Sequence, residues 1–301
     1  MQTFIFAFLA IVSYAASLLV LRATLEVWPM GLAGVFSRVV SISLLAAWVL
    51  GTGNGWRRLL PRGTGKWLML MGLISITINL LWFSAASLTT ATNVALLFRL
   101  DLVFVLLIGG MLGLERIKPV ILPLLAVMLV GLGLFTEIQR FNWGGHLVGD
   151  AMVIFAAFGL AANAFVIRYI MRKMDEEAVA LYNHSISIFG FLVLALAGGE
   201  FHELQFYSRP LNDWLWIVFL GVLLAVGLPL YYAALRRMEV WKLRTFLLTA
   251  PLMVAVLELP LWGIHFSTQQ YVGAAMILGG LLLFVQLDSR SQSEPCEPIE
   301  P

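Results

Sequence analysis

Hydrophobic residues in this chain fall in long runs separated by short polar segments. An α-helix rises about 1.5 Å per residue, so roughly 18 to 23 apolar residues cross a hydrocarbon core of about 30 Å. Ten runs of this kind predict spans at 3–21, 31–50, 67–86, 93–112, 119–136, 150–168, 179–198, 213–235, 245–263 and 271–287. The pattern therefore predicts an all-α integral membrane protein with ten transmembrane helices.

The first and sixth runs resemble each other. Residues 14–22 read YAASLLVLR, and residues 160–168, which lie 146 positions later, read LAANAFVIR. Because the second copy starts after an odd number of spans, it is predicted to have the opposite orientation in the membrane. We expect two inverted five-helix repeats at 1–136 and 150–287, joined by an outer, periplasmic-side linker at 137–149. The polar tail at 288–301 is predicted to be disordered and cytoplasmic.

Composition supports a membrane protein and argues against several other classes. The chain has 61% hydrophobic and 12% charged residues, which does not suit a soluble fold of 301 residues. Its one cysteine, Cys296, cannot form a disulfide framework or a multi-cysteine metal site. We find no phosphate-binding glycine loop and no nucleophile with a partner base. We therefore expect no enzyme activity, no cofactor, no metal and no nucleic-acid partner.

Basic residues predict the orientation. With a cytoplasmic N-terminus, fourteen of the nineteen lysines and arginines fall in inner loops or the tail, Arg244 among them. Arg22, Arg140 and Arg209 fall outside, and Arg38 and Arg99 lie within spans. This distribution predicts a multi-pass protein of the cell inner (plasma) membrane with both termini in the cytoplasm.

Several motifs resemble those of EamA-type members of the drug/metabolite transporter superfamily. The matching segments are Asn93–Leu97, Leu102–Val105 and Gly113–Arg116 in the first half, and Tyr231–Leu235, Thr249–Leu252 and Gly273–Gly280 in the second. The resemblance implies two inverted five-helix repeats, a central cavity open to one side at a time, and movement of small organic metabolites, often outward. Glu115 and Pro251 keep the family pattern. Asp101 replaces its usual proline, from which we expect a straighter fourth span.

Four ionisable side chains lie within predicted spans: Arg38, Arg99, Asp101 and Glu258. A charge at the bilayer centre costs about 2.5 to 3.5 kcal/mol on insertion scales, so these residues should face the bundle interior or pair. We expect Arg99 opposite Glu258 and Arg38 near Asp101, with a substrate carboxylate or phosphate competing for the arginines. One alternative is static ion pairs that set helix register. Another is proton uptake by Asp101 and Glu258, which would couple transport to a proton gradient.

Aromatic, hydroxyl and amide residues in spans one, three, six and eight are further candidates for substrate binding, because these spans flank the cavity in the family. They are Tyr14, Ser17, Asn79, Trp82, Asn163, Tyr231 and Tyr232. Tyrosine and tryptophan faces would hold an aromatic or cationic part of a ligand, and the amides would orient its polar end. The alternative is ordinary helix packing or an interfacial aromatic belt. His184 and the other histidines lack metal-ligand spacing.

These features predict a secondary active transporter that exports or exchanges a small polar organic metabolite by alternating access. An amino acid or related zwitterion suits two arginines and two carboxylates best. One alternative is an organic-anion transporter for a sugar phosphate or nucleotide sugar. Another is a non-transporting membrane scaffold for envelope or lipid biosynthesis, which would lack a central cavity. The expected partners are the lipid bilayer, a small-molecule substrate and, in the coupled alternative, protons. The sequence does not determine the oligomeric state.

Overall fold

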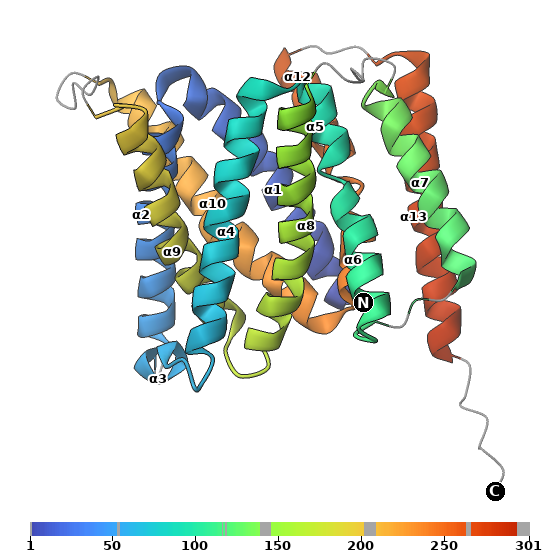
Figure 1. The fold of residues 1–301 in the computed structure, drawn as a ribbon, viewed down its shortest axis with the longest axis horizontal. Coiled ribbons are helices and arrows are strands. Elements are labelled where there is room, and N and C mark those ends of the chain that lie inside the picture. Colours follow the sequence, from blue (N-terminus) through green and yellow to red (C-terminus); the bar gives the residue numbers. More distant parts are fainter. Residues whose placement is uncertain are drawn as a thin grey trace, which may run out of the picture.

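The computed structural model describes residues 2–52, 55–115, 117, 119–138, 146–201, 209–262 and 266–293, and in these ranges every regular element is helical. The helices are α1 (Gln2–Val27), α2 (Met30–Gly51), α3 (Gly55–Leu59), α4 (Gly65–Leu88), α5 (Ala91–Leu97), α6 (Leu100–Met111), η1 (Pro119–Ile121), α7 (Leu122–Phe135), α8 (Leu147–Ile170), α9 (Glu176–Ala197), α10 (Leu211–Arg237), α11 (Val240–Leu247), α12 (Ala250–Trp262) and α13 (Thr268–Ser293). The first residues of α1 and the last residues of α13 lie on the same side of the bundle, at the bottom of Figure 1.

In the described residues, each of the ten predicted spans falls mainly on helix. Eight stretches in the described residues are long and apolar enough to cross a membrane. Two further apolar helices, Gly65–Leu81 and Pro119–Phe135, are shorter. The chain is therefore a multi-pass membrane protein built from apolar helices. The last helix, α13, reaches Ser293 and so passes the predicted span end at 287.

Local sequence explains where several helices begin and end. The Thr90 hydroxyl oxygen accepts a hydrogen bond from the Asn93 backbone N–H at 3.1 Å and caps the start of α5. Proline precedes α2 at position 29, where a missing N–H costs nothing. After α6, Gly113 adopts φ +62°, a left-handed conformation that glycine tolerates at a helix end.

The fourth and ninth spans are not continuous helices, and the prediction of a straighter fourth span is wrong. The chain breaks between α5 and α6 at residues 98–99 and between α11 and α12 at residues 248–249. At both breaks, a backbone N–H donates to the carbonyl three residues earlier, as in a 3₁₀ turn, instead of four residues earlier, as in an α-helix. These hydrogen bonds run from Leu102 N–H to the Arg99 carbonyl (3.2 Å) and from Thr249 N–H to the Phe246 carbonyl (3.0 Å). The first break therefore needs no proline. The two breaks lie 150 residues apart in the sequence.

A carboxylate anchors the start of each broken span. Glu115 accepts a hydrogen bond from the Trp241 backbone N–H at 3.1 Å, near the start of α11, and also pairs with Arg168. Asp150 accepts a hydrogen bond from the Asn93 side-chain amide at 2.9 Å, near the start of α5. Burial raises the pKa of Glu115, against the opposing effects of its backbone donors and Arg168. Each half of the chain thus holds the broken span of the other half.

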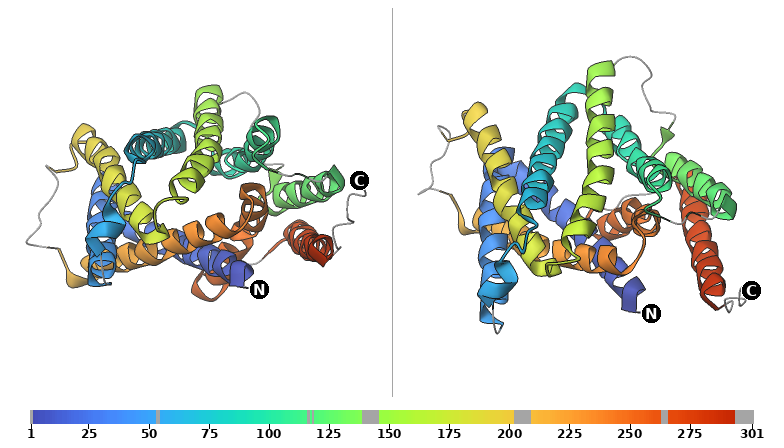
Figure 2. Two further views of the ribbon diagram at one scale, coloured as in Figure 1. Left: turned by 90° about the horizontal axis from the view of Figure 1, so that it is seen from below. Right: turned by 60° about the horizontal axis from the view of Figure 1, so that its bottom comes forward.

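The helices form two layers closed at both ends. One layer holds α4, α5, α6 and α8, and the other holds α1, α10, α11 and α12 (Figure 2). The pair α2 and α9 lies at one end, and the pair α7 and α13 lies at the other. Glycine permits the close approach in the second pair, because a Cβ on Gly273 would lie 2.5 Å from the Gly131 carbonyl oxygen. The space between the layers is where the cavity lies.

Candidate functional site: a central cavity

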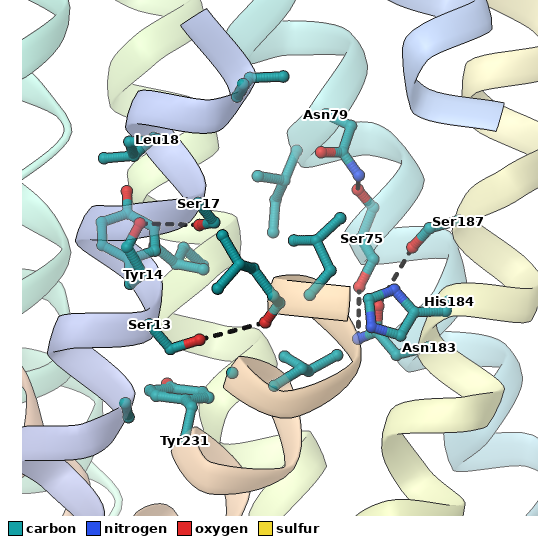
Figure 3. A pocket seen from close by; sticks show the side chains of 18 of the residues that line it. Ser13, Tyr14, Ser17, Leu18, Ser75, Asn79, Asn183, His184, Ser187 and Tyr231 are labelled. Atoms are coloured by element: carbon teal, nitrogen blue, oxygen red, sulfur yellow. Dashed lines mark hydrogen bonds between the residues drawn. The ribbon is translucent and has the colours of Figure 1, made fainter. Parts of the chain in front are cut away.

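A cavity of about 420 Å³ lies between the two layers. Helices α1, α2, α4, α8, α9, α10 and α11 line it, together with the break between α5 and α6 (Figure 3). The predicted substrate-binding residues Tyr14, Ser17, Arg38, Asn79, Arg99, Asn163, Tyr231 and Tyr232 all line this cavity. The remaining candidate, Trp82, has its side chain outside the described residues. Spans one, three, six and eight therefore flank one cavity, as expected.

Helices α1 and α8 present equivalent positions to the cavity. From α1 the lining includes Tyr14, Ser17, Leu18 and Leu21, and from α8 it includes Leu160, Asn163, Ala164 and Ile167. Each set follows the i, i+3, i+4, i+7 spacing of one helix face. The two sets are offset by 146 residues, the same offset as in the sequence repeat.

One wall of the cavity is a hydrogen-bonded network of small polar side chains. The Ser75 hydroxyl accepts from the Asn163 amide at 3.0 Å and from the Asn183 amide at 3.4 Å. Asn183 also donates to the Tyr232 hydroxyl at 2.8 Å and accepts from Ser187 at 3.1 Å. This network joins α4, α8, α9 and α10. Among the described residues, the buried Asn163 Oδ1 atom has no hydrogen-bond partner.

The opposite wall, from α1 and the part of α10 around Tyr231, is mainly aromatic and apolar. The Ser13 and Ser17 hydroxyls donate to backbone carbonyls, at 3.1 Å and 2.7 Å, and so are already satisfied. The rings of Tyr231 and Tyr232 lie 5.7 Å apart. Figure 3 shows Tyr14 and Tyr231 on this side, across from Ser75 and Asn183. An apolar cavity with a few fixed polar groups is the usual form of a small-molecule site.

The predicted charge pairings are wrong. Asp101 pairs with Arg244 at 3.0 Å, and both side chains are at most 5% exposed. Glu258 pairs with Arg22 at 3.2 Å, and the Arg22 side chain is 58% exposed. The errors come from span ends: α1 continues through Arg22 to Val27, and α11 begins at Val240, so that Arg244 is buried rather than in an inner loop. Arg99 and Arg38 both line the cavity instead.

Arg38 and His184 present unsatisfied nitrogen atoms. The Arg38 guanidinium lies 3.9 Å from the centre of the Phe191 ring, and in the described residues it donates a hydrogen bond to the Gly34 carbonyl at 3.4 Å. His184 is 4% exposed. Neither Arg38 Nε nor His184 Nε2 has a hydrogen-bond partner in the described part of the chain.

Sequence reasoning missed His184, Asn183, Ser75 and Arg244 as cavity residues. A signal for His184 was present, because position 184 is position 38 moved by the repeat offset of 146. No such signal marked Arg244.

Within the described residues, no three His, Cys, Asp or Glu side chains lie close enough to share a metal ion.

Comparison with known proteins agrees with this geometry. Residues 147–286, from α8 into α13, match the EamA-like transporter family. The chain is 25% identical over 264 residues to an uncharacterized transporter of Archaeoglobus fulgidus, covering 85% of this chain and 87% of that protein. It is 22% identical over 237 residues to an uncharacterized transporter of Synechocystis sp., covering 73% of this chain and 65% of that protein.

The fold also matches a protein known from a crystal structure. The TM-score is 0.80 at 19% sequence identity, and the match covers 96% of this chain and 99% of that chain. This likeness concerns the fold alone. The family match and the two transporter relatives confirm the resemblance of this chain to EamA-type members of the drug/metabolite transporter superfamily, and residues 147–286 match the EamA-like transporter family.

Proposed function

We propose that this protein is a secondary transporter that exports or exchanges a small zwitterionic metabolite, such as an amino acid, by alternating access. The observation that carries the proposal is the cavity of about 420 Å³ between the two layers, lined by charged and amide groups that a solute would contact. Its location between helix layers is typical of transporter binding sites. A scaffold with no cargo would have no need of such a cavity.

The contacts between helices support two inverted repeats. If each helix is exchanged for its counterpart in the other half, the contact of α1 with α10 becomes that of α8 with α4, and both are extensive. The contact of α6 with α8 becomes that of α12 with α1, which is also present. The pairs α2 with α9 and α7 with α13 exchange with themselves. In such an arrangement the two exposures of the cavity are related by symmetry, which gives alternating access.

The charges in the cavity favour a cargo that carries an anionic group. Asp101 is already neutralised by Arg244, so that Arg38 and Arg99 remain as cationic side chains at the lining. Asn163 Oδ1 and His184 Nε2 provide atoms without partners in the described residues, and these suit a cargo that also carries hydrogen-bond donors. A zwitterion supplies both kinds of group.

An organic anion is the second candidate, because the lining arginines outnumber the free carboxylates described at the cavity. Proton coupling through Asp101 or Glu258 has less support, since both carboxylates pair with arginine and protonation would break an ion pair. We therefore leave protons out of the proposed cycle. The placement in the inner membrane, with both termini cytoplasmic, rests on the distribution of basic residues.

Counterflow in liposomes tests the proposal. Purified protein would be reconstituted, loaded in turn with amino acids, sugar phosphates, nucleotide sugars and neutral sugars, and assayed for uptake of the same labelled solute. We expect saturable exchange of at least one amino acid. Exchange of sugar phosphates alone would favour the organic-anion alternative. The absence of saturable flux for every solute, with protein that remains folded, would contradict the proposed function.

A further inference from the structure

We propose that Arg38 and His184 form a two-part subsite that binds the carboxylate and the ammonium group of an α-amino acid with an apolar side chain. The inference rests on the proposed transport function and names the cargo class and the residues that select it. Sequence reasoning placed Arg38 among the candidate site residues but assigned His184 no role.

The two residues occupy equivalent positions in the two halves of the chain. Helices α2 and α9 each contain 22 residues and begin 146 residues apart, at Met30 and Glu176. Arg38 and His184 are therefore the ninth residues of their helices. Because α2 and α9 pack against each other and both residues line the cavity, one ligand can contact both.

Both side chains carry a polar atom that nothing else in the described residues uses. Arg38 Nε and His184 Nε2 are buried and lack hydrogen-bond partners there. A buried polar atom left unpaired costs about 1–3 kcal/mol, so such atoms are rare in folded proteins. Two of them at equivalent positions in one cavity are accounted for by a ligand that pairs with both.

The chemistry of the two groups differs in a way that fits a zwitterion. A guanidinium only donates hydrogen bonds, and Arg38 is held in place over the Phe191 ring, so it suits a carboxylate. The His184 ring is hydrogen-bonded to the backbone of Leu224. With Nδ1–H as the donor in that bond, a neutral ring leaves Nε2 as an acceptor, which suits an ammonium group. The unpaired Asn163 Oδ1 atom is a second acceptor in the same cavity.

The rest of the lining specifies the side chain of the cargo. Leucines from four helices contribute much of the remaining surface: Leu18, Leu160, Leu220, Leu223, Leu224, Leu228 and Leu247. An apolar side chain would bury its surface against them. L-leucine is therefore the probe that the geometry suggests.

Nitrogen NMR of the histidine side chains tests the subsite directly. Protein labelled with ¹⁵N-histidine in detergent micelles would be titrated with L-leucine, with isocaproate, which lacks the ammonium group, and with isoamylamine, which lacks the carboxylate. The His184 signal is the one absent from His184→Gln, or from His184→Asn if that variant does not fold. We expect leucine to shift this signal saturably and each analogue to bind at least tenfold more weakly.

Arg38→Gln should weaken leucine binding at least tenfold, whereas Arg57→Gln, the same change at an exposed arginine of α3, should leave it unchanged. The subsite is disproved if leucine gives no saturable shift, if isocaproate or isoamylamine binds as well as leucine, or if Arg38→Gln binds leucine like the parent protein. A protein that fails this test but exchanges other solutes in counterflow keeps the proposed function and loses the subsite. A protein that binds leucine here but gives no flux loses the transport function alone.

Discussion

Arg244 and Arg38 both line the central cavity, but their charges are balanced differently. Arg244 lies 3.0 Å from Asp101, and both side chains are almost fully buried. Arg38 stacks on Phe191 and forms no salt bridge in the described residues. A buried ion pair can persist for structural reasons, since its charges neutralise each other. Arg38 is partly buried, and its buried Nε atom has no hydrogen-bond partner in the described residues. A cation of this kind without a carboxylate is better explained by a ligand, so this difference separates the structural arginine from the binding arginine.

The largest expected effect is on the free energy of unfolding and comes from breaking the Asp101–Arg244 ion pair. Asp101→Asn leaves Arg244 as an uncompensated buried charge, which typically costs about 3–5 kcal/mol. We expect the variant to unfold at much lower denaturant concentration in detergent. The double substitution Asp101→Asn with Arg244→Gln should recover most of the loss. An unchanged unfolding midpoint in the single variant would show that the pair is not a structural element.

Substitution of Arg38, which has no salt bridge in the described residues, should impair transport and not stability. Arg38→Gln removes a charged hydrogen bond to the cargo, worth about 1.5–3 kcal/mol, so exchange at low substrate concentration should fall roughly tenfold to hundredfold. Stability should hold or rise slightly, because a partly buried charge without a carboxylate partner in the described residues is removed. The measurements are counterflow and unfolding of the same preparation, with Arg57→Gln as the control. Loss of stability with normal flux would reverse the roles assigned to the two arginines.

A third arginine, Arg22, has a carboxylate partner like Arg244 but is largely exposed to solvent. Arg22 pairs with Glu258, but the Arg22 side chain is 58% exposed, and exposed ion pairs contribute about 0–1 kcal/mol. Arg22→Gln should therefore change the unfolding free energy by less than about 1 kcal/mol and leave exchange within about twofold of the parent. A collapse of flux would mean that Glu258 acts in transport, as the sequence-based alternative of ion coupling holds.

The smallest effect concerns a carboxylate at the edge of the bundle. Burial raises the pKa of Glu115, so its contribution to stability is present below the pKa of the unfolded chain and is lost as pH rises through the folded-state value. Compared with Glu115→Gln, the parent protein should lose thermal stability as the pH rises above about 4. A gain over this range would show that the Arg168 pair, rather than burial, dominates at this carboxylate.

The sequence predicted the helices well, because the length of a hydrophobic run reflects the thickness of the hydrocarbon core that it crosses. In the described residues each of the ten runs falls mainly on helix, and the repeat at residues 14–22 and 160–168, from which the inversion was predicted, coincides with two helix faces that line the cavity. Of the polar residues inside apolar runs, Arg38, Arg99, Asn79 and Asn163 line the cavity, whereas Asp101 and Glu258 are not among its lining residues; their role in binding stays a prediction.

The ion pairs of Asp101 and Glu258 could not be predicted, because they depend on the exact residues at which the helices begin and end. Arg244 lies in a run with few apolar residues, WKLR, which hydropathy assigned to a loop, although α11 starts before it and is buried. The break at residues 98–99 has no proline to mark it. His184 could have been recognised as a cavity residue only from its correspondence to Arg38 in the repeat, because its neighbours in the sequence form no recognisable site motif.

Accessibility of the repeat counterparts Ser17 and Asn163 tests the alternating cavity most directly. After Cys296→Ser, single cysteines at positions 17 and 163 would be exposed to a membrane-impermeant thiol reagent from each side of sealed vesicles. We expect both sites to react from both sides in turn, and an exchanged amino acid to slow both reactions. Reaction of each cysteine from only one side, with no effect of any solute, would contradict a cavity that alternates between the two faces of the membrane.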